Sequence, residues 1–395
     1  MSTGSPVVGI VGGGQLARMT YDAAGPLGVE VAVLAQPGDE ATVGHVPRVT
    51  VVDTLDRRAL HHFASGCDVV TFDHERVAAA HIVALQRLGH TVRPGALAMT
   101  MASDKASQRR HLGHLGFPVP AFAVVEGPAG VHEFGDAHGW PLVVKAARGG
   151  YDGRGVHLFD DPSDVAGLDQ VAGPSSLVVE PHLDIELELS VLVARRPAGP
   201  LVTYPVVETR QDGAAICREV LAPADIDRAL AHAARDLAVR ISHAVDAVGI
   251  LAVELFVVDG ELVVNELAAR PHNTGHHTIE ACETSQFENH LRAVLDLPLG
   301  PTRLKAPHAA MANVLAAGDG EITEVDEPPA GTWAHLYGKT PRRGRKIGHV
   351  TAIGADARTV RHEAVSTAHR LEAQTAPPRT PAEPPSRAPL AGVTG

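Results

Sequence analysis

Two glutamates in apolar surroundings carry the strongest chemical signal in this sequence. Residues 251–258 and 262–267 are strand-like apolar runs, and Asp259-Gly260 between them is a turn signal. Each run holds one carboxylate, Glu254 or Glu266. Because a buried carboxylate without a partner is costly, the two together predict a shared cation. Two surface carboxylates on an amphipathic hairpin are the structural alternative.

The length of the turn decides whether the two glutamates can meet. A two-residue turn would pair Val258 with Glu261 and would place the glutamates on opposite faces. A three-residue loop would pair Val258 with Leu262 and would set the glutamates directly across from each other. We predict the three-residue loop. Donors suited to an anion beside the cation follow at once, namely Arg270, His272 and Asn273.

A second group of residues predicts a phosphate site. Lys145 ends a buried strand at 141–145, and residues 149–155 then supply four glycines whose amides can close over phosphates. Lys145 can reach the same phosphates as a point charge. The strand at 176–179 runs into residues 180–183, whose backbone can hydrogen-bond an adenine edge, and Glu188 on the next strand can bind a ribose. A flexible hairpin and a solvated strand face are the alternatives.

The first strand, Val7 to Val11, enters a glycine turn that resembles a dinucleotide fingerprint. Gly12, Gly14 and Ala17 match G-x-G-x-x-A, but the second strand ends in Ala35-Gln36 without the acid that holds an NAD ribose. The turn therefore favours another phosphate, or close strand–helix packing, over NAD. Glu75 follows the strand at 69–72, and ligands collect at such carboxyl ends. A helix N-cap is the alternative role for Glu75.

Positive charge is concentrated in one turn of a chain whose formal net charge is −12. Residues 339–346 hold five cations in eight positions, which predicts a site for a phosphate or carboxylate, with a solvated basic turn as the alternative. The acidic balance argues against a nucleic-acid partner. The three cysteines have no metal or redox spacing, and no apolar run is long enough for a membrane span. We therefore expect a cytoplasmic protein.

The order of the elements predicts three folded units. Residues 1–98 form a Rossmann-like layer, which ends near Arg93-Pro94-Gly95. A smaller unit with the lysine strand covers 99–189, and the unit with the glutamate hairpin covers 190–372. Residues 373–395 are rich in Pro, Ala and Thr and are expected to be disordered, so that truncation after Leu371 should cost no stability.

Taken together, these motifs resemble a known family. The order of glycine turn, lysine strand, glycine-rich loop and paired strand carboxylates resembles the ATP-grasp superfamily, and more narrowly its N5-carboxyaminoimidazole ribonucleotide synthetases. The segments that carry the resemblance extend over roughly residues 7–350, and they include GGGQLARM, VVKAARGGYDGRG, NELAARPHNTGHH and YGKTPRRGRKIGH. The resemblance implies an α/β chain with an ATP-grasp fold, in which a Rossmann-like pre-ATP-grasp domain precedes a small mobile lid domain and a C-terminal α+β domain.

The resemblance also implies ligands and roles. Bicarbonate and its phosphorylated product would meet Arg270, His272 and Asn273, and Mg²⁺, or alternatively Mn²⁺, would be held by Glu254 and Glu266. The ribonucleotide would be gripped by Gln15, Leu16, Glu75, Tyr151, Arg154, Lys339, Arg345 and Lys346. ATP would be bound by Lys105, Lys145, Gly150, Tyr151, Asp152, Gly153, Arg154, Gly155, Val156, Glu180, Pro181, His182, Leu183, Glu188, Asn265 and Glu266.

The activity implied by the resemblance is ATP- and bicarbonate-dependent carboxylation of aminoimidazole ribonucleotide, through carboxyphosphate, by a cytoplasmic homodimeric ligase of purine biosynthesis. Its partners would be small molecules, with no nucleic acid or membrane. Another ATP-grasp carboxylate–amine ligase is the closest alternative, because its nucleotide residues would look alike. One departure concerns Lys105, which stands where the family commonly has an arginine near ATP.

Overall fold

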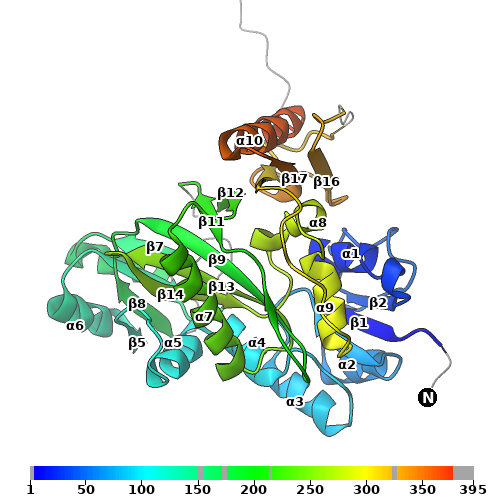
Figure 1. Cartoon of the computed structure of the whole chain (residues 1–395). Coiled ribbons are helices and arrows are strands. Elements are labelled where there is room, and N and C mark those ends of the chain that lie inside the picture. The colour runs from blue at the N-terminus through cyan, green and yellow to red at the C-terminus, as the bar shows by residue number, and fades with distance from the viewer. Residues whose placement is uncertain (1–3, 150–154, 171–175, 214–215, 323–326, 377–395) are drawn as a thin grey trace, which may run out of the picture.

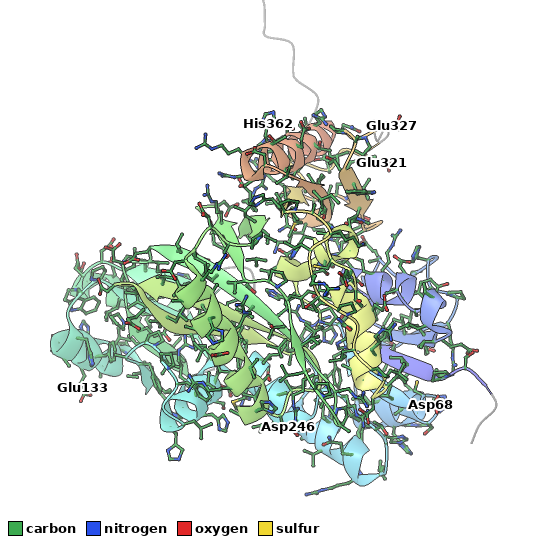
Figure 2. The ribbon with its side chains drawn as sticks, viewed as in Figure 1. Asp68, Glu133, Asp246, Glu321, Glu327 and His362 are labelled. Atoms are coloured by element: carbon green, nitrogen blue, oxygen red, sulfur yellow. The ribbon has the colours of Figure 1, made fainter. Side chains whose placement is uncertain are left out.

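The computed structural model describes residues 4–149, 155–170, 176–213, 216–322 and 327–376. Three β-sheets with helices packed against them form the fold, and Figure 1 shows the first sheet and the lysine-bearing sheet on opposite sides of the molecule. This arrangement confirms the predicted α/β class. Polar side chains such as Asp68, Glu133, Asp246 and His362 lie at the periphery (Figure 2). None of the described helices is long and apolar enough to cross a membrane.

The first sheet is parallel and has the order β3-β2-β1-β4. Its strands are nearly continuous apolar runs, as expected when helices cover both faces. Val11 lies beside Phe72, so the glycine turn after β1 and the acidic segment after β4 lie next to each other at one edge. The elements are β1 (Val7–Val11), α1 (Gln15–Asp22), η1 (Gly25–Leu27), β2 (Glu30–Ala35), β3 (Val49–Val51), α2 (Arg57–Ala64), β4 (Val69–Phe72), α3 (Ala79–Arg87) and α4 (Ala96–Ser103).

The second sheet is antiparallel, has the order β5-β8-β6-β7, and packs on α6 and η2 through its own apolar core. Lys145 and Glu180 lie on the neighbouring strands β6 and β8, because Val143 pairs with Glu180 and Lys145 pairs with Val178. The elements are α5 (Lys105–His114), β5 (Ala123–Val125), α6 (Pro128–His138), β6 (Leu142–Ala146), β7 (Val156–Phe159), η2 (Pro162–Gln170) and β8 (Leu177–Pro181).

The third sheet is antiparallel and has nine strands in the described chain, in the order β14-β13-β9-β11-β12-β15-β17-β16 with β10 beside β9. The predicted domain boundary after residue 189 falls inside β9. The elements are β9 (Leu187–Arg195), β10 (Val202–Thr203), β11 (Val207–Gln211), β12 (Cys217–Ala222), α7 (Arg228–Ala244), β13 (Gly249–Val258), β14 (Glu261–Ala268), η3 (Asn273–Gly275), α8 (Thr278–Ala281), α9 (Gln286–Val294), β15 (His308–Leu315), β16 (Thr332–Leu336), β17 (Lys346–Gly354) and α10 (Ala357–Gln374).

The glutamate hairpin β13–β14 corrects one prediction and confirms another. Its turn has two residues, Asp259 with φ 50° and Gly260 with φ 75°, so the predicted three-residue loop is wrong. Both positive φ angles are typical of a type I′ turn. The register then shifts next to Glu254, and this β-bulge brings Glu254 opposite Glu266 as predicted. At the bulge, the carbonyl oxygen of Asn265 accepts a hydrogen bond of 2.8 Å from Arg109.

A buried histidine joins the first sheet to the third. His290 of α9 accepts a hydrogen bond at Nδ1 from the backbone N–H of Ile250, at 3.1 Å. Its Nε2 therefore carries the proton and donates to Thr71 Oγ1 on β4, at 2.8 Å. Burial lowers the pKa of His290 to about 3, so the ring is neutral. This one side chain fixes the acidic edge of the first sheet against the sheet that carries the glutamates.

The ordered chain continues past the predicted start of the tail at Ala373. Helix α10 extends to Gln374, and Thr375 is fully buried. The Thr375 hydroxyl accepts a hydrogen bond of 2.7 Å from Ala317 N–H, and Glu372 accepts one of 2.8 Å from Leu315 N–H. These contacts tie the end of α10 to the segment that leaves β15. Residues 377–395 lie outside the described part of the chain.

Truncation after Leu371 is therefore expected to destabilise the protein relative to truncation after Ala376. The shorter form loses these two hydrogen bonds, each of which contributes about 0.5–1.5 kcal/mol, and it also loses the ion pair of Glu372 with Arg218. We expect the free energy of unfolding to fall by about 1–3 kcal/mol, measured by urea denaturation of both truncated forms. Equal midpoints would show that the end of α10 contributes nothing.

Candidate active site

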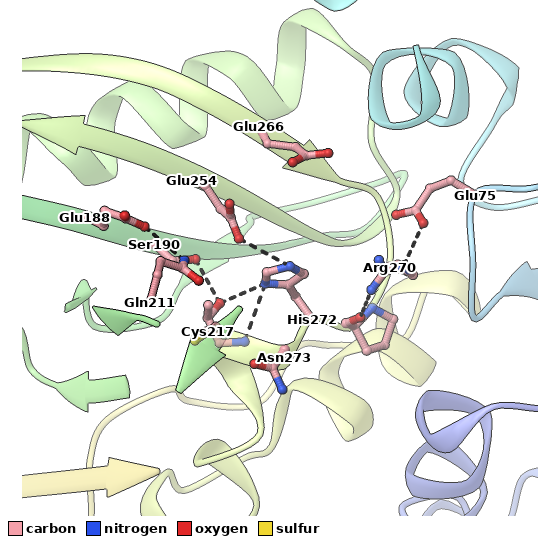
Figure 3. Close-up of polar contacts among 12 residues, drawn as sticks. Glu75, Glu188, Ser190, Gln211, Cys217, Glu254, Glu266, Arg270, His272 and Asn273 are labelled. Carbon is pink, nitrogen blue, oxygen red and sulfur yellow. Dashed lines mark hydrogen bonds and ion pairs between the residues drawn. The ribbon is translucent and has the colours of Figure 1, made fainter. Parts of the chain in front are cut away.

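Three carboxylates lie on one face of the third sheet. Glu254 pairs with Glu266 of β14 and with Ser190 of β9, and Glu188 is two residues from Ser190, so all three glutamates project to the same side. Figure 3 shows them along neighbouring strands. Burial, together with the neighbouring Glu266 and Glu188, raises the pKa of Glu254 to about 8. A cation bound between Glu254 and Glu266 would relieve this repulsion, and the cation itself stays a prediction.

The donor set is compatible with a hard divalent cation such as Mg²⁺. Among the described residues, no group of three or more His, Cys, Asp or Glu side chains is arranged to hold a metal. Mg²⁺ does not need such a group, because it commonly binds through one or two carboxylates, with substrate phosphates and waters completing its shell. Lys105 Nζ lies 2.6 Å from Glu266 Oε1 and neutralises part of the site. The predicted ATP contact Lys105 thus lies directly beside a predicted metal ligand.

The loop after β14 places a cation and a neutral histidine beside the carboxylates. Arg270 Nε donates to Glu75 Oε2 at 2.8 Å, which brings the end of β4 to this loop (Figure 3). Burial, followed by the charges of Arg270 and Lys346, lowers the pKa of His272 to about 3. His272 Nδ1 accepts from the N–H of Thr274, so Nε2 carries the proton and faces Glu254 Oε1 at 3.5 Å.

The side chain of Asn273 has different partners from those of Arg270 and His272. Its side-chain amide pairs reciprocally with that of Asn313 on β15, with both N···O distances at 2.8 Å. Asn313 also donates to the carbonyl oxygen of Cys217 on β12. In this structure Asn273 therefore anchors the loop to the third sheet, whereas Arg270 and His272 face the carboxylates.

A buried ion cluster lies where the sequence predicts the nucleotide phosphates. Glu180 Oε2 is 2.6 Å from Lys145 Nζ, and Glu180 Oε1 is 2.5 Å from Arg109 Nε. Burial alone would raise the pKa of Glu180, but the two cations outweigh it and lower the pKa to about 2. Arg109 was missed by the sequence analysis. The sequence feature that could have identified Arg109 is its position as a charged residue on the face of α5 that packs against the second sheet.

The other predicted ATP contacts are placed as follows. His182 N–H donates to the carbonyl oxygen of Pro141 at 3.0 Å, so this amide is not available to adenine. Glu188 accepts from Gln211 Nε2 at 2.9 Å, and its pKa is raised by burial. Gly155 has φ 74° and Val156 is exposed at the start of β7. Pro181 and Leu183 flank His182. The predicted residues Gly150, Tyr151, Asp152, Gly153 and Arg154 lie outside the described residues.

The basic turn lies against the first domain. Lys339 Nζ donates to Gln15 Oε1 at 2.6 Å, although the two residues are far apart in the sequence. Arg345 pairs with Glu40 at 3.0 Å, a partner that the sequence analysis did not identify. Leu16 is buried against Tyr337, so only its backbone can face a ligand. Two of the predicted substrate residues, Gln15 and Lys339, thus meet, while Lys346 is the first residue of β17 and its charge acts on His272.

Two aspartates accept hydrogen bonds from the backbone amides of the first glycine turn. Gly14 N–H donates to Asp73 Oδ2 at 2.6 Å, and Gly13 N–H donates to Asp39 Oδ2 at 3.1 Å. Burial and the nearby Asp39 raise the pKa of Asp73 to about 6. A dinucleotide would need these amides for its pyrophosphate, and the two acids would repel it. The structure therefore favours close packing for the turn over the NAD alternative.

Comparisons with known proteins agree with this geometry. Family models match residues 6–103 (ribonucleotide synthetase preATP-grasp domain), 110–287 (ATP-grasp domain) and 309–363 (phosphoribosylaminoimidazole carboxylase C-terminal domain). The N5-carboxyaminoimidazole ribonucleotide synthase of Mycobacterium tuberculosis is 43% identical over 379 residues, which cover 93% of this chain and 88% of the relative. The chain belongs to the N5-carboxyaminoimidazole ribonucleotide synthase family.

Solved structures of N5-carboxyaminoimidazole ribonucleotide synthases resemble this one along almost the whole chain. The Thermus thermophilus enzyme superposes with a TM-score of 0.83 at 38% identity, covering 92% of this chain and 98% of that one. The Aspergillus clavatus enzyme, in complex with ADP and 5-aminoimidazole ribonucleotide, gives a TM-score of 0.82 at 28% identity and covers 94% and 98%. The family resemblance stated from the motifs is therefore confirmed.

Proposed function

We propose that this chain carboxylates 5-aminoimidazole ribonucleotide with ATP and bicarbonate, yielding N5-carboxyaminoimidazole ribonucleotide, ADP and phosphate. The observation that carries the proposal is a series of contacts that starts at the loop after the β13–β14 carboxylates. Arg270 of this loop pairs with Glu75, and Asp73 of the same segment accepts from Gly14. Gln15, the next residue, accepts from Lys339. Family membership supports the same activity, because relatives with this name cover most of the chain. The complex of the Aspergillus relative with ADP and the ribonucleotide supports both ligands.

Magnesium would be held by Glu254 and Glu266, where it would neutralise the charge of the β- and γ-phosphates. Lys145 and Arg109, already pressed against Glu180, would hold phosphate oxygens of ATP from the side of the second sheet. A magnesium or manganese ion, a homodimeric assembly and a cytoplasmic location are finer parts of the proposal. The family resemblance supports all three, and the oxygen ligands of the site suit either ion.

The chemistry then depends on placing a small anion in line with the γ-phosphate. Arg270 supplies guanidinium N–H groups and His272 supplies a neutral Nε2–H donor, both suited to bicarbonate. A bicarbonate oxygen attacks the γ-phosphorus and ADP leaves, which gives carboxyphosphate. The exocyclic amine of the ribonucleotide then attacks the carboxyl carbon of carboxyphosphate, and phosphate leaves with the amine proton. Alternatively, carboxyphosphate first breaks down to CO₂ and phosphate, and the amine attacks the CO₂. Catalysis is mainly positioning and charge stabilisation.

Heavy-oxygen labelling tests this mechanism. Bicarbonate enriched in ¹⁸O should transfer label to the released phosphate in an amount that matches the carboxylated product, because one of its oxygens becomes the bridge of carboxyphosphate. The phosphate would be analysed by mass spectrometry under conditions of slow exchange with water. A ligase that activates another carboxylate would turn over without bicarbonate. Unlabelled phosphate alongside full product formation would exclude carboxyphosphate.

Alanine at Lys339 or Arg345 is expected to raise the KM for the ribonucleotide while leaving the KM for ATP nearly unchanged. Both cations lie in the basic turn and away from the Lys145–Glu180 cluster, and a lost charge-assisted contact costs about 1.5–3 kcal/mol. That loss corresponds to a rise of roughly 10- to 150-fold. Steady-state kinetics with each substrate varied in turn measures both constants. Equal rises in the two constants would contradict a phosphate-binding role for the turn.

A further inference from the structure

The loop that follows β2 lies between the glycine turn and the basic turn. Asp39 accepts hydrogen bonds from Gly13 N–H at 3.1 Å and from Gln36 N–H at 2.9 Å, so it fixes the loop to the glycine turn. The next residue, Glu40, reaches in the other direction, to the basic turn some 300 residues later. Two consecutive acids thus hold the two segments that carry Gln15 and Lys339.

Glu40 makes two charge-assisted contacts through a single oxygen. Its Oε2 accepts a hydrogen bond of 2.7 Å from the backbone N–H of Thr340 and one of 3.0 Å from Arg345 Nη1. Arg345 Nη1 also donates to the carbonyl oxygen of Thr340 at 2.8 Å, which closes a small ring of contacts. The N–H of Thr340, and after it the charge of Arg345, lower the pKa of Glu40 despite partial burial. Glu40 is therefore ionised at neutral pH.

This arrangement leaves most of the guanidinium edge of Arg345 unused. Within the described part of the chain, the side-chain hydrogen bonds of Arg345 go through Nη1 alone, to Glu40 and to Thr340. Nε and Nη2 keep three N–H donors, and a guanidinium held by one nitrogen presents the others in a fixed direction. About a quarter of the Arg345 side chain is exposed, so an anion can reach this edge.

We propose that Glu40 is a positioning residue for the substrate phosphate. It fixes the Thr340 backbone and the Arg345 guanidinium, so that Lys339 and Arg345 are already ordered when they meet the phosphate of the ribonucleotide. The inference rests on the proposed function, in which the basic turn binds that phosphate. Glu40 also brings a negative charge near an anion site, which opposes binding. The proposal states that the gain from ordering exceeds this repulsion.

The test compares Glu40→Ala and Glu40→Gln with the wild-type enzyme. For Glu40→Ala we expect the KM for the ribonucleotide to rise about tenfold, within the range of coupling between contacting charged groups, and the KM for ATP to change by less than about twofold. Glu40→Gln keeps an acceptor for Thr340 N–H, so its rise should be smaller. Glu283→Ala is a matched control, because it removes the carboxylate of an ion pair with the exposed Arg303.

A double-mutant cycle with Arg345→Ala separates this inference from the proposed function. Because Glu40 acts in part through Arg345, Glu40→Ala should raise the KM for the ribonucleotide by clearly less than about tenfold once Arg345 is alanine, and the remaining rise measures its hold on the Thr340 backbone. If Arg345→Ala leaves this KM unchanged, the phosphate role of the basic turn fails. If Arg345→Ala raises it while both Glu40 variants leave it unchanged or lower it, the positioning role of Glu40 fails.

Discussion

Replacing Glu266 with glutamine is expected to reduce turnover by at least about a hundredfold while the fold stays intact. Glutamine keeps the size of the side chain but removes the charge that a hard cation requires. The loss corresponds to about 3 kcal/mol of transition-state stabilisation. Lys105 would lose its ion-pair partner, yet the pair is partly exposed to solvent, so its loss should cost little stability.

ADP formation at saturating magnesium measures this effect, and thermal unfolding of the same sample checks the fold. Glu261→Gln is a matched control, because Glu261 lies on the same strand but is exposed beside the turn. Wild-type turnover by Glu266→Gln would mean that the paired carboxylates of the hairpin are structural.

The second large effect is expected for stability rather than turnover. Glu180→Gln should lower the free energy of unfolding of the ligand-free protein by about 3–5 kcal/mol, because it leaves the buried cations Lys145 and Arg109 without their counter-charge. Urea denaturation at neutral pH measures the change, since wild-type Glu180 is ionised there.

Glu283→Gln provides the comparison for Glu180. It breaks an ion pair of similar length with Arg303, whose side chain is 80% exposed, and such pairs contribute about 0–1 kcal/mol. If the two variants lost the same small amount of stability, Glu180 would be stabilised by solvent rather than by its two cations.

The hairpin shows how far sequence reasoning extended. The two strands and the following donor loop were predictable from residue types, and the Asp-Gly pair was a correct signal for a two-residue turn. The facing of the two glutamates was predicted correctly but for the wrong reason, through a three-residue loop that the structure does not have. The actual solution, a bulge at Asn265, has no signature of its own in composition.

Partners far apart in the sequence were the main omission. Lys145 and Glu180 were each identified, but not Arg109, whose role depends on helix α5 packing under the second sheet. Asp73 and Glu40 were missed for the same reason, since their hydrogen-bond partners belong to other segments. The end of α10 was predicted wrongly because Thr375 is buried and held by hydrogen bonds to segments far away in the sequence, which composition does not reveal.

The bulge in the glutamate hairpin also shows that the turn alone does not set the register at the glutamates. A two-residue turn and one extra residue on β14 leave an odd number of residues between Glu254 and Glu266. Glu254 is held separately by its pairing with Ser190 of β9, so a residue added in the turn is taken up by a longer loop while both carboxylates stay on one face. A one-residue slip of β14 against β13 would instead send Glu266 to the opposite face. Loop grafting at this hairpin should therefore tolerate insertions of odd or even length.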